Sequence, residues 1–138
     1  MSIVLGYDES PGAVRALHVA IEVSAAFGEP LVLVYGAAAP GALGEEYTAH
    51  RDAVQAAGRT ALSHAVGVAD EAGVPTTVEV IDQKPAEALI EAATRHAARF
   101  IVVGSWGESP LRGALLGSTP HKLLHLSRTP VLCVPTEP

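Results

Sequence analysis

The sequence predicts a doubly wound α/β fold, with helices on both faces of a mostly parallel sheet. Short apolar runs alternate with longer segments of helical periodicity, and this alternation is typical of βαβ units. The first run, residues 3–5, is apolar on both faces, as expected for a central strand of a parallel sheet. Because 49% of the residues are hydrophobic and only 4% aromatic, we expect a core of Val, Leu, Ile and Ala.

The first helix is predicted from its end signals. Ser10 fits the N-cap position and Pro11 the first helical position. The helix is expected to run to about Phe27 and to end at Gly28. The apolar residues expected on one of its faces are Val14, Leu17, Ile21 and Ala25.

The remaining elements continue the alternation. Strands are predicted where apolar and β-branched residues run together between turn residues. Helices are predicted where apolar residues recur at intervals of three and four. The predicted strands are residues 31–35, 76–81, 100–103 and 131–134, and the predicted helices are residues 45–72, a segment opening at Pro85, and residues 119–126.

Composition narrows the functional class. The formal net charge of -6 and the scattered basic residues argue against broad affinity for nucleic acid. No apolar run is long enough to span a membrane, and the first residues do not resemble a signal peptide. The single cysteine, Cys133, is expected to be a buried and inert thiol. We therefore expect one cytoplasmic domain over residues 1–138.

A glycine-rich segment follows the fourth predicted strand. Gly104 and Gly107 come first, and Gly117, Ser118 and Thr119 then begin a helix. Glycine at a strand end allows φ angles that other residues avoid, and a helix start offers unpaired N–H groups to an anion. In open α/β sheets, ligands bind beyond the carboxyl ends of the strands. The spacing therefore predicts a phosphate site, although the same residues could serve only as turns and a helix cap.

Two better-known phosphate motifs do not fit the chain. A Rossmann fingerprint should follow the first strand, and residues 6–10 do not match it. Residues 113–118 lack the lysine that a P-loop requires. Asp8, after the first strand, is read as a ligand-binding residue, with stabilisation of the turn into the first helix as the alternative.

The pattern Gly104-x2-Gly107-x9-Gly117-Ser118 resembles the nucleotide-binding signature of ATP-binding universal stress proteins. Asp8, residues 84–90 and residues 130–134 also resemble that family. The resemblance covers essentially the whole chain. It implies a Rossmann-like, five-stranded parallel sheet of order 3-2-1-4-5, with helices on both faces as three α/β/α layers.

The same resemblance implies a ligand and a site. The ligand would be ATP with Mg, and the protein would form a homodimer through its last strand, Val131 to Val134. Asp8, with Gly6 and Tyr7, would meet the ribose or adenine. Backbone at Gly36 and Val103 would face the adenine. The residues implied to hold ribose and phosphates are Gly104, Gly107, Gly117, Ser118 and Thr119.

Three departures from the family pattern bear on the ligand. Trp106, residues 108–110 and Pro120 replace smaller, more polar or more glycine-rich family positions. These changes would weaken triphosphate binding or favour AMP or cyclic AMP instead. Trp106 either covers the nucleotide or packs in the dimer face.

Other candidate residues have simpler explanations. Arg112 could neutralise a phosphate or stay solvated. His121 and His125 have the spacing of a two-histidine metal site but are read as surface residues. Lys84 is read as solvated and far from the site, because it leaves an edge strand.

No arrangement typical of a strong catalyst is present. The glycine-rich segment contains neither paired carboxylates nor a lysine, and the chain has no CxxC motif. The first hypothesis is therefore a nucleotide-binding sensor or regulator of the stress response. The alternatives are a slow ATPase, with Asp8 or His121 as base, and a nucleotide-free dimeric adaptor.

Overall fold

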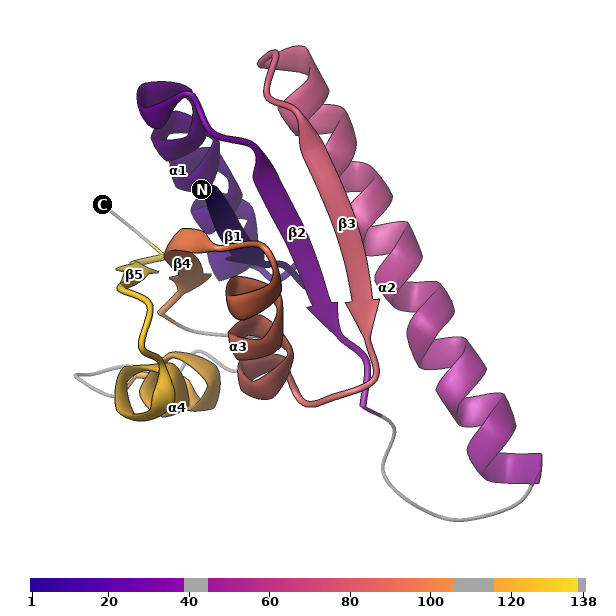
Figure 1. Ribbon diagram of the computed structural model, residues 1–138. Helices are drawn as coiled ribbons and strands as arrows, with labels where there is room; N and C mark the ends of the chain where they lie inside the picture. Colours follow the sequence, from indigo (N-terminus) through magenta and orange to yellow (C-terminus); the bar gives the residue numbers. More distant parts are fainter. Residues whose placement is uncertain (39–44, 106–115, 137–138) are drawn as a thin grey trace.

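Helices and strands alternate strictly in the computed structural model, which describes residues 1–38, 45–105 and 116–136 (Figure 1). The strands are β1 Ser2–Gly6, β2 Leu31–Gly36, β3 Thr76–Ile81, β4 Ala98–Gly104 and β5 Val131–Val134, and the helices are α1 Pro11–Phe27, α2 Glu45–Glu71, α3 Pro85–Arg95 and α4 Ser118–Leu126. Every predicted element is confirmed, and no predicted bound differs from the observed one by more than two residues.

The sheet has the order β3-β2-β1-β4-β5, and all of its paired strands are parallel, as the family resemblance implied. The central strand is β1, where Val4 lies between Val32 of β2 and Ile101 of β4. The chain builds outward from β1 to β3 and then returns to the other side of β1 for β4 and β5. The strand order therefore reverses between β1 and β4, where open sheets of this kind bind ligands.

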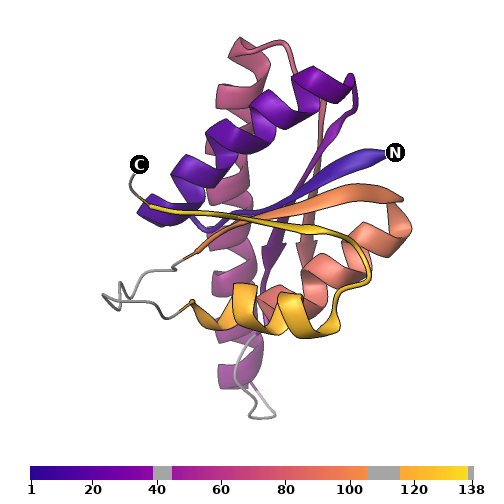
Figure 2. The same cartoon turned by 90° about the vertical axis from the view of Figure 1, so that its left-hand side faces the viewer.

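The sheet forms the middle of three layers (Figure 2). One core cluster packs α1 and α2 against one face, with Leu5, Leu17 and Leu62 fully buried. A second cluster packs α3 and α4 against the other face, with Leu89 and Leu123 fully buried. None of the helices within the described ranges combines the length and apolarity needed to cross a membrane.

The end signals of α1 act as predicted. Ser10 is the N-cap, and its Oγ accepts a hydrogen bond from the Ala13 N–H at 3.2 Å. Gly28 ends the helix in the left-handed conformation, with φ of 65°.

The predicted buried face of α1 is partly wrong. Val14 is 40% exposed, and Ala25 is exposed as well. Small residues let this helix approach the sheet closely, so the buried stripe is rotated toward alanines. The buried residues of α1 are Gly12, Ala13, Ala16, Leu17, Ala20, Ile21 and Ser24.

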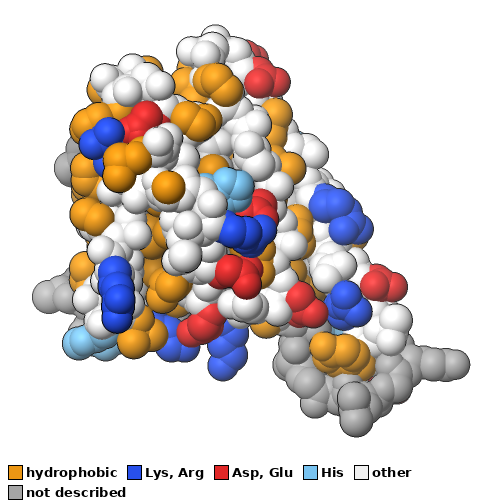
Figure 3. Space-filling model, viewed as in Figure 1, with side chains coloured by type: hydrophobic (Ala, Val, Ile, Leu, Met, Phe, Trp, Pro, Cys, Tyr) orange, Lys and Arg blue, Asp and Glu red, His pale blue; other side chains and the backbone are white. Residues whose placement is uncertain are grey.

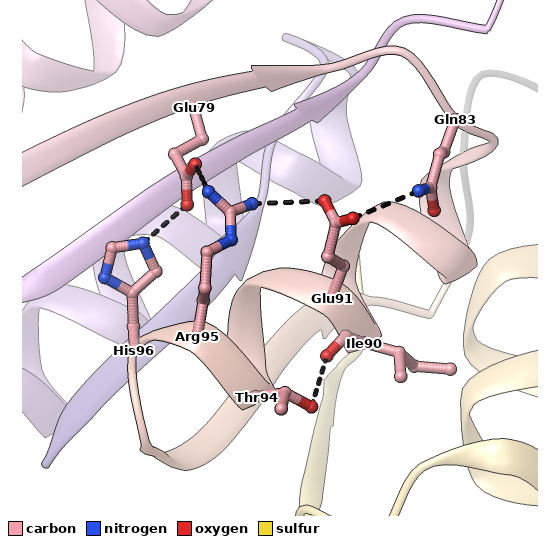
Figure 4. Close-up of polar contacts among 7 residues, drawn as sticks. All are labelled: Glu79, Gln83, Ile90, Glu91, Thr94, Arg95 and His96. Atoms are coloured by element: carbon pink, nitrogen blue, oxygen red, sulfur yellow. Dashed lines mark hydrogen bonds and ion pairs between the residues drawn. The ribbon is translucent and has the colours of Figure 1, made fainter.

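A polar cluster joins the edge strand β3 to the end of α3 (Figure 4). The Glu79 carboxylate contacts both the Arg95 guanidinium and the His96 ring. Arg95 also donates to Glu91 at 3.1 Å, and Glu91 accepts from Gln83 at 3.2 Å. Because the Glu79 side chain is only 16% exposed, its contacts are shielded more than those of an ordinary surface pair.

Candidate functional site

A pocket of about 230 Å³ opens at the carboxyl ends of β1, β2 and β4, at the reversal of strand order. The residues lining it come from the turn after β1, the end of β2, the start of α3, the end of β4 and the start of α4. The pocket brings together the predicted site residues Gly6, Tyr7, Asp8, Gly36, Val103, Gly104, Gly117, Ser118 and Thr119. The tenth predicted residue, Gly107, lies outside the described residues, as do Trp106 and Arg112.

The turn after β1 supplies one polar wall. Tyr7 is buried, and its N–H donates to the Val34 carbonyl at 3.0 Å. Burial, followed by the charges of Glu9 and Asp8, raises the pKa of the Tyr7 phenol. The Tyr7 phenol is therefore neutral at physiological pH.

Asp8 stabilises the turn into α1 and also lies in the pocket wall, so its position is compatible with both predicted roles. Its Oδ1 accepts a hydrogen bond from the Ser10 N–H at 3.0 Å, which stabilises the turn into α1. The same exposed side chain also lines the pocket. Next to it, Glu9 has a left-handed backbone with φ of 64°, and its carboxylate contacts the His64 ring of α2. These contacts hold the turn at the mouth of the pocket.

The end of β2 lies directly against the start of α3. A Cβ atom at Gly36 would come within 2.6 Å of the Pro85 Cα. This close approach brings Pro85 and Leu89 into the pocket wall, where they join Val34 and Val103 as apolar lining. Neither residue was predicted for the site, because only the tertiary packing of α3 places them there.

The predicted reason for glycine at position 104 is wrong. The φ angle of Gly104 lies outside the left-handed region. A Cβ atom there would instead come within 2.8 Å of the carbonyl carbon and oxygen of Gly12. Glycine is required because the backbone of α1 passes directly over the end of β4.

The end of β4 is tied to the start of α4. The Ser105 N–H donates to the Val134 carbonyl at 2.8 Å, and the Gly117 N–H donates to the Ser105 carbonyl at 2.8 Å. Gly117 is the N-cap of α4, without a side-chain cap. The N–H groups of Ser118 and Thr119, in the first turn, have no intrahelical partner, and Pro120 has no N–H. Two N–H groups and two hydroxyls are thus available to an anion.

Two other residues occupy different places from those expected. Lys84 is exposed but, contrary to the prediction, borders a groove that adjoins the pocket, because the connection from β3 to α3 passes beneath Gly36. Cys133 is half-buried rather than fully buried, and burial raises the pKa of its thiol.

The His121 and His125 rings pack edge to face with centroids 4.8 Å apart. Among the described residues, no group of three or more His, Cys, Asp or Glu side chains could hold a metal ion.

Comparison with known proteins gives consistent matches. The sequence pattern of the universal stress protein family matches residues 1–135. The chain is 37% identical over 84 residues to universal stress protein YxiE of Bacillus subtilis, covering 61% of this chain and 57% of that protein. It thus aligns with little more than half the length of this curated relative.

Two solved structures resemble the fold over nearly the whole chain. One, described as a universal stress protein in complex with cAMP, is 29% identical and has a TM-score of 0.77, covering 99% of this chain and 98% of that one. The other, a universal stress protein family member from Burkholderia pseudomallei, is 29% identical with a TM-score of 0.77, covering 97% and 96%.

Proposed function

Because the chain belongs to the universal stress protein family, we propose that it binds an adenine nucleotide in the pocket between β1 and β4 and acts as a nucleotide-dependent regulator of the stress response. The observation that carries this proposal is the composition of the pocket. An apolar wall, a carboxylate and an uncapped helix start meet in one cavity at the reversal of strand order. The relative solved with cAMP supports an adenine nucleotide as the ligand.

Each part of the nucleotide has a suitable partner. The adenine would pack against Val34, Leu89 and Val103 near the backbone of Gly36. The Asp8 carboxylate would accept hydrogen bonds from the ribose hydroxyls, since its second oxygen is not needed by the turn. The first phosphate would accept hydrogen bonds from the N–H and hydroxyl groups of Ser118 and Thr119.

ATP with Mg is the form of the ligand that we propose. Mg²⁺ keeps several waters and binds nucleotides mainly through their phosphates, with one or two carboxylates at most. The described residues contain no three-ligand cluster, which fits an ion brought by the nucleotide and not held by a protein cage. AMP and cyclic AMP are the alternatives that the sequence departures favour.

Binding without rapid turnover is the proposed mode of action. Asp8 is the sole carboxylate among the described residues that line the pocket, and one of its oxygens accepts the Ser10 N–H. A general base must be free to take a proton from the attacking water. The nucleotide would therefore act as a regulatory ligand and would not be hydrolysed rapidly. We expect the protein in the cytoplasm.

A homodimer through β5 is also proposed. In the described sheet β5 is an edge strand, and Leu132 in its middle is 37% exposed. Two further leucines on the adjoining α4, Leu124 and Leu126, are 54% and 57% exposed. An exposed edge with apolar neighbours favours pairing with a second copy of the strand.

The position of the ligand can be tested by following backbone amide signals by NMR during titration with AMP. The proposal predicts the largest shifts at Gly6, Val103 and Ser118. Thr94 and Ser127, at the far end of α3 and α4, serve as internal controls. Shifts confined to Thr94 and Ser127, or scattered over the surface, would contradict binding in this pocket.

A further inference from the structure

A second cavity adjoins the pocket, between the first turns of α3 and α4. This groove has a volume of about 510 Å³ and shares Pro85, Ser118 and Thr119 with the pocket. A ligand group that leaves the pocket past Ser118 and Thr119 therefore enters the groove directly. Beyond the shared residues, its wall includes Lys84, Glu87 and Lys122.

The charge of this groove differs from that of the rest of the protein. The chain has a formal net charge of -6 and only two lysines, Lys84 and Lys122, and both line this one groove. Figure 3 shows Lys or Arg side chains beside an acidic one at the lower edge of the molecule, below α3. Three arginines have carboxylate partners elsewhere, in the pairs Arg51–Asp82, Arg95–Glu79 and Arg99–Glu29.

The two lysines are held differently. The Lys122 Nζ lies 2.8 Å from Glu87 Oε1. This hydrogen bond is the main cause that lowers the pKa of Glu87, and the charge of Lys84 lowers it further. Lys84 forms no ion pair within the described part of the chain. Two ammonium groups and one carboxylate thus line the groove, and the charge of Lys84 has no ion-pair partner among the described residues.

We propose that Lys84 and Lys122 bind the outer phosphates of the nucleotide in this groove, and that these two residues set the preference of the pocket for ATP over AMP. The inference rests on the proposed function, which places the first phosphate at Ser118 and Thr119. The next phosphates extend between Lys84 and Lys122. Lysine is a compact charge with rotatable donors that suits phosphate oxygens. Glu87 lowers the affinity for phosphate, because its carboxylate competes with the phosphate for the Lys122 ammonium group.

The test compares AMP with ATP, both with excess Mg, by calorimetry on the whole chain. Wild type is expected to bind ATP more tightly than AMP. Lys122→Gln and Lys84→Gln are each expected to lower the affinity for ATP about fivefold to tenfold and the affinity for AMP less than about twofold. Glu87→Gln is expected to raise the affinity for ATP about threefold, because it removes the carboxylate charge that repels the phosphates. Arg59→Gln, an exposed residue of α2 outside both cavities, is the matched control for net charge.

The outcomes separate the two proposals. Equal affinity for AMP and ATP would overturn the proposal that the groove binds the outer phosphates. Lysine variants that lower the affinity for both nucleotides equally would do the same. Either result would leave the proposal of nucleotide binding in the pocket standing. No binding of either nucleotide would overturn the pocket and the groove together.

A second readout uses the fact that the chain has only two lysines. ATP, but not AMP, should slow acetylation of Lys84 and Lys122 relative to the α-amine. Equal acetylation rates with ATP and with AMP would also overturn the inference.

Discussion

Gly104 at the end of β4 and Gly12 in α1 lie so close that a Cβ atom at position 104 would come within 2.8 Å of the Gly12 backbone. The contact joins the strand that ends at the pocket to the helix that follows Asp8. The two sides of the candidate site therefore share one rigid junction, made of backbone on both sides. A backbone junction cannot relax by moving a side chain.

The first prediction concerns this junction. Gly104→Ala should lower the free energy of unfolding by about 1–3 kcal/mol, because the methyl group overlaps backbone atoms of α1. Urea denaturation monitored by circular dichroism measures the change. Gly67→Ala in α2 is the control, since a Cβ atom there meets nothing within 4 Å. It should stabilise the helix by about 0.5–1 kcal/mol, and equal effects of the two changes would contradict the account.

The second prediction separates turn stabilisation by Asp8, which the structure shows, from its proposed contact with the nucleotide. Asp8→Asn keeps an oxygen that can accept the Ser10 N–H, so the free energy of unfolding should change by less than about 0.5 kcal/mol. Loss of the charge should weaken nucleotide binding about tenfold. Denaturation and calorimetry on the same variant measure the two effects. If the affinity is unchanged, Asp8 stabilises the turn alone.

The third prediction concerns the cluster of Figure 4. Glu79→Gln should destabilise the protein by about 1 kcal/mol, because Arg95 and His96 both lose a shielded carboxylate. Glu91→Gln removes a carboxylate whose side chain is 45% exposed, and should cost less than about 0.5 kcal/mol. Thermal denaturation of both variants gives the comparison. A larger loss for Glu91→Gln would contradict the assignment of Glu79 as the link between β3 and α3.

The fourth prediction distinguishes the two edges of the sheet. Leu132→Lys on β5 should convert the proposed dimer to monomer, because it places a charge in the edge that pairs. Val78→Lys on the other edge strand, β3, changes a residue that is 50% exposed and should leave the dimer intact. Sedimentation equilibrium measures both. A wild-type protein that is monomeric at all concentrations would contradict the dimer.

The sequence predicted the elements well because buried parallel strands appear as short apolar runs between turn residues. Ser10, Pro11 and Gly28 also marked the ends of α1 correctly, because helix caps depend on the local conformation of one or two residues. The buried face of α1 was harder to predict, because alanines and not the larger Val14 face the core, and Val14 is exposed. The order of the sheet came from the family resemblance and not from periodicity.

The pocket was predicted less completely than the fold. The residues after β1 and β4 could be named, because ligands bind beyond these strand ends. Pro85 and Leu89 belong to α3, which follows an edge strand, and Lys84 directly precedes that helix. Only the close approach of the start of α3 to Gly36 brings Pro85 and Leu89 to the pocket and Lys84 to the adjoining groove. The role of Gly104 was misjudged for a related reason, since contact with Gly12 joins parts of the chain distant in sequence.

Nucleotide binding at the start of α4 is the central claim, and calorimetric titration of wild type, Ser118→Asp and Ser118→Asn with ATP tests it most directly. Aspartate at the first position of α4 should stabilise the helix by about 0.3–1 kcal/mol, so the variant should remain folded while its charge repels phosphate. Asparagine has a similar shape without the charge. We predict micromolar binding in wild type, at least about tenfold weaker binding in Ser118→Asp, and a smaller change in Ser118→Asn. No heat from wild type at millimolar ATP, AMP and cyclic AMP, or equal binding by Ser118→Asp, would contradict the claim.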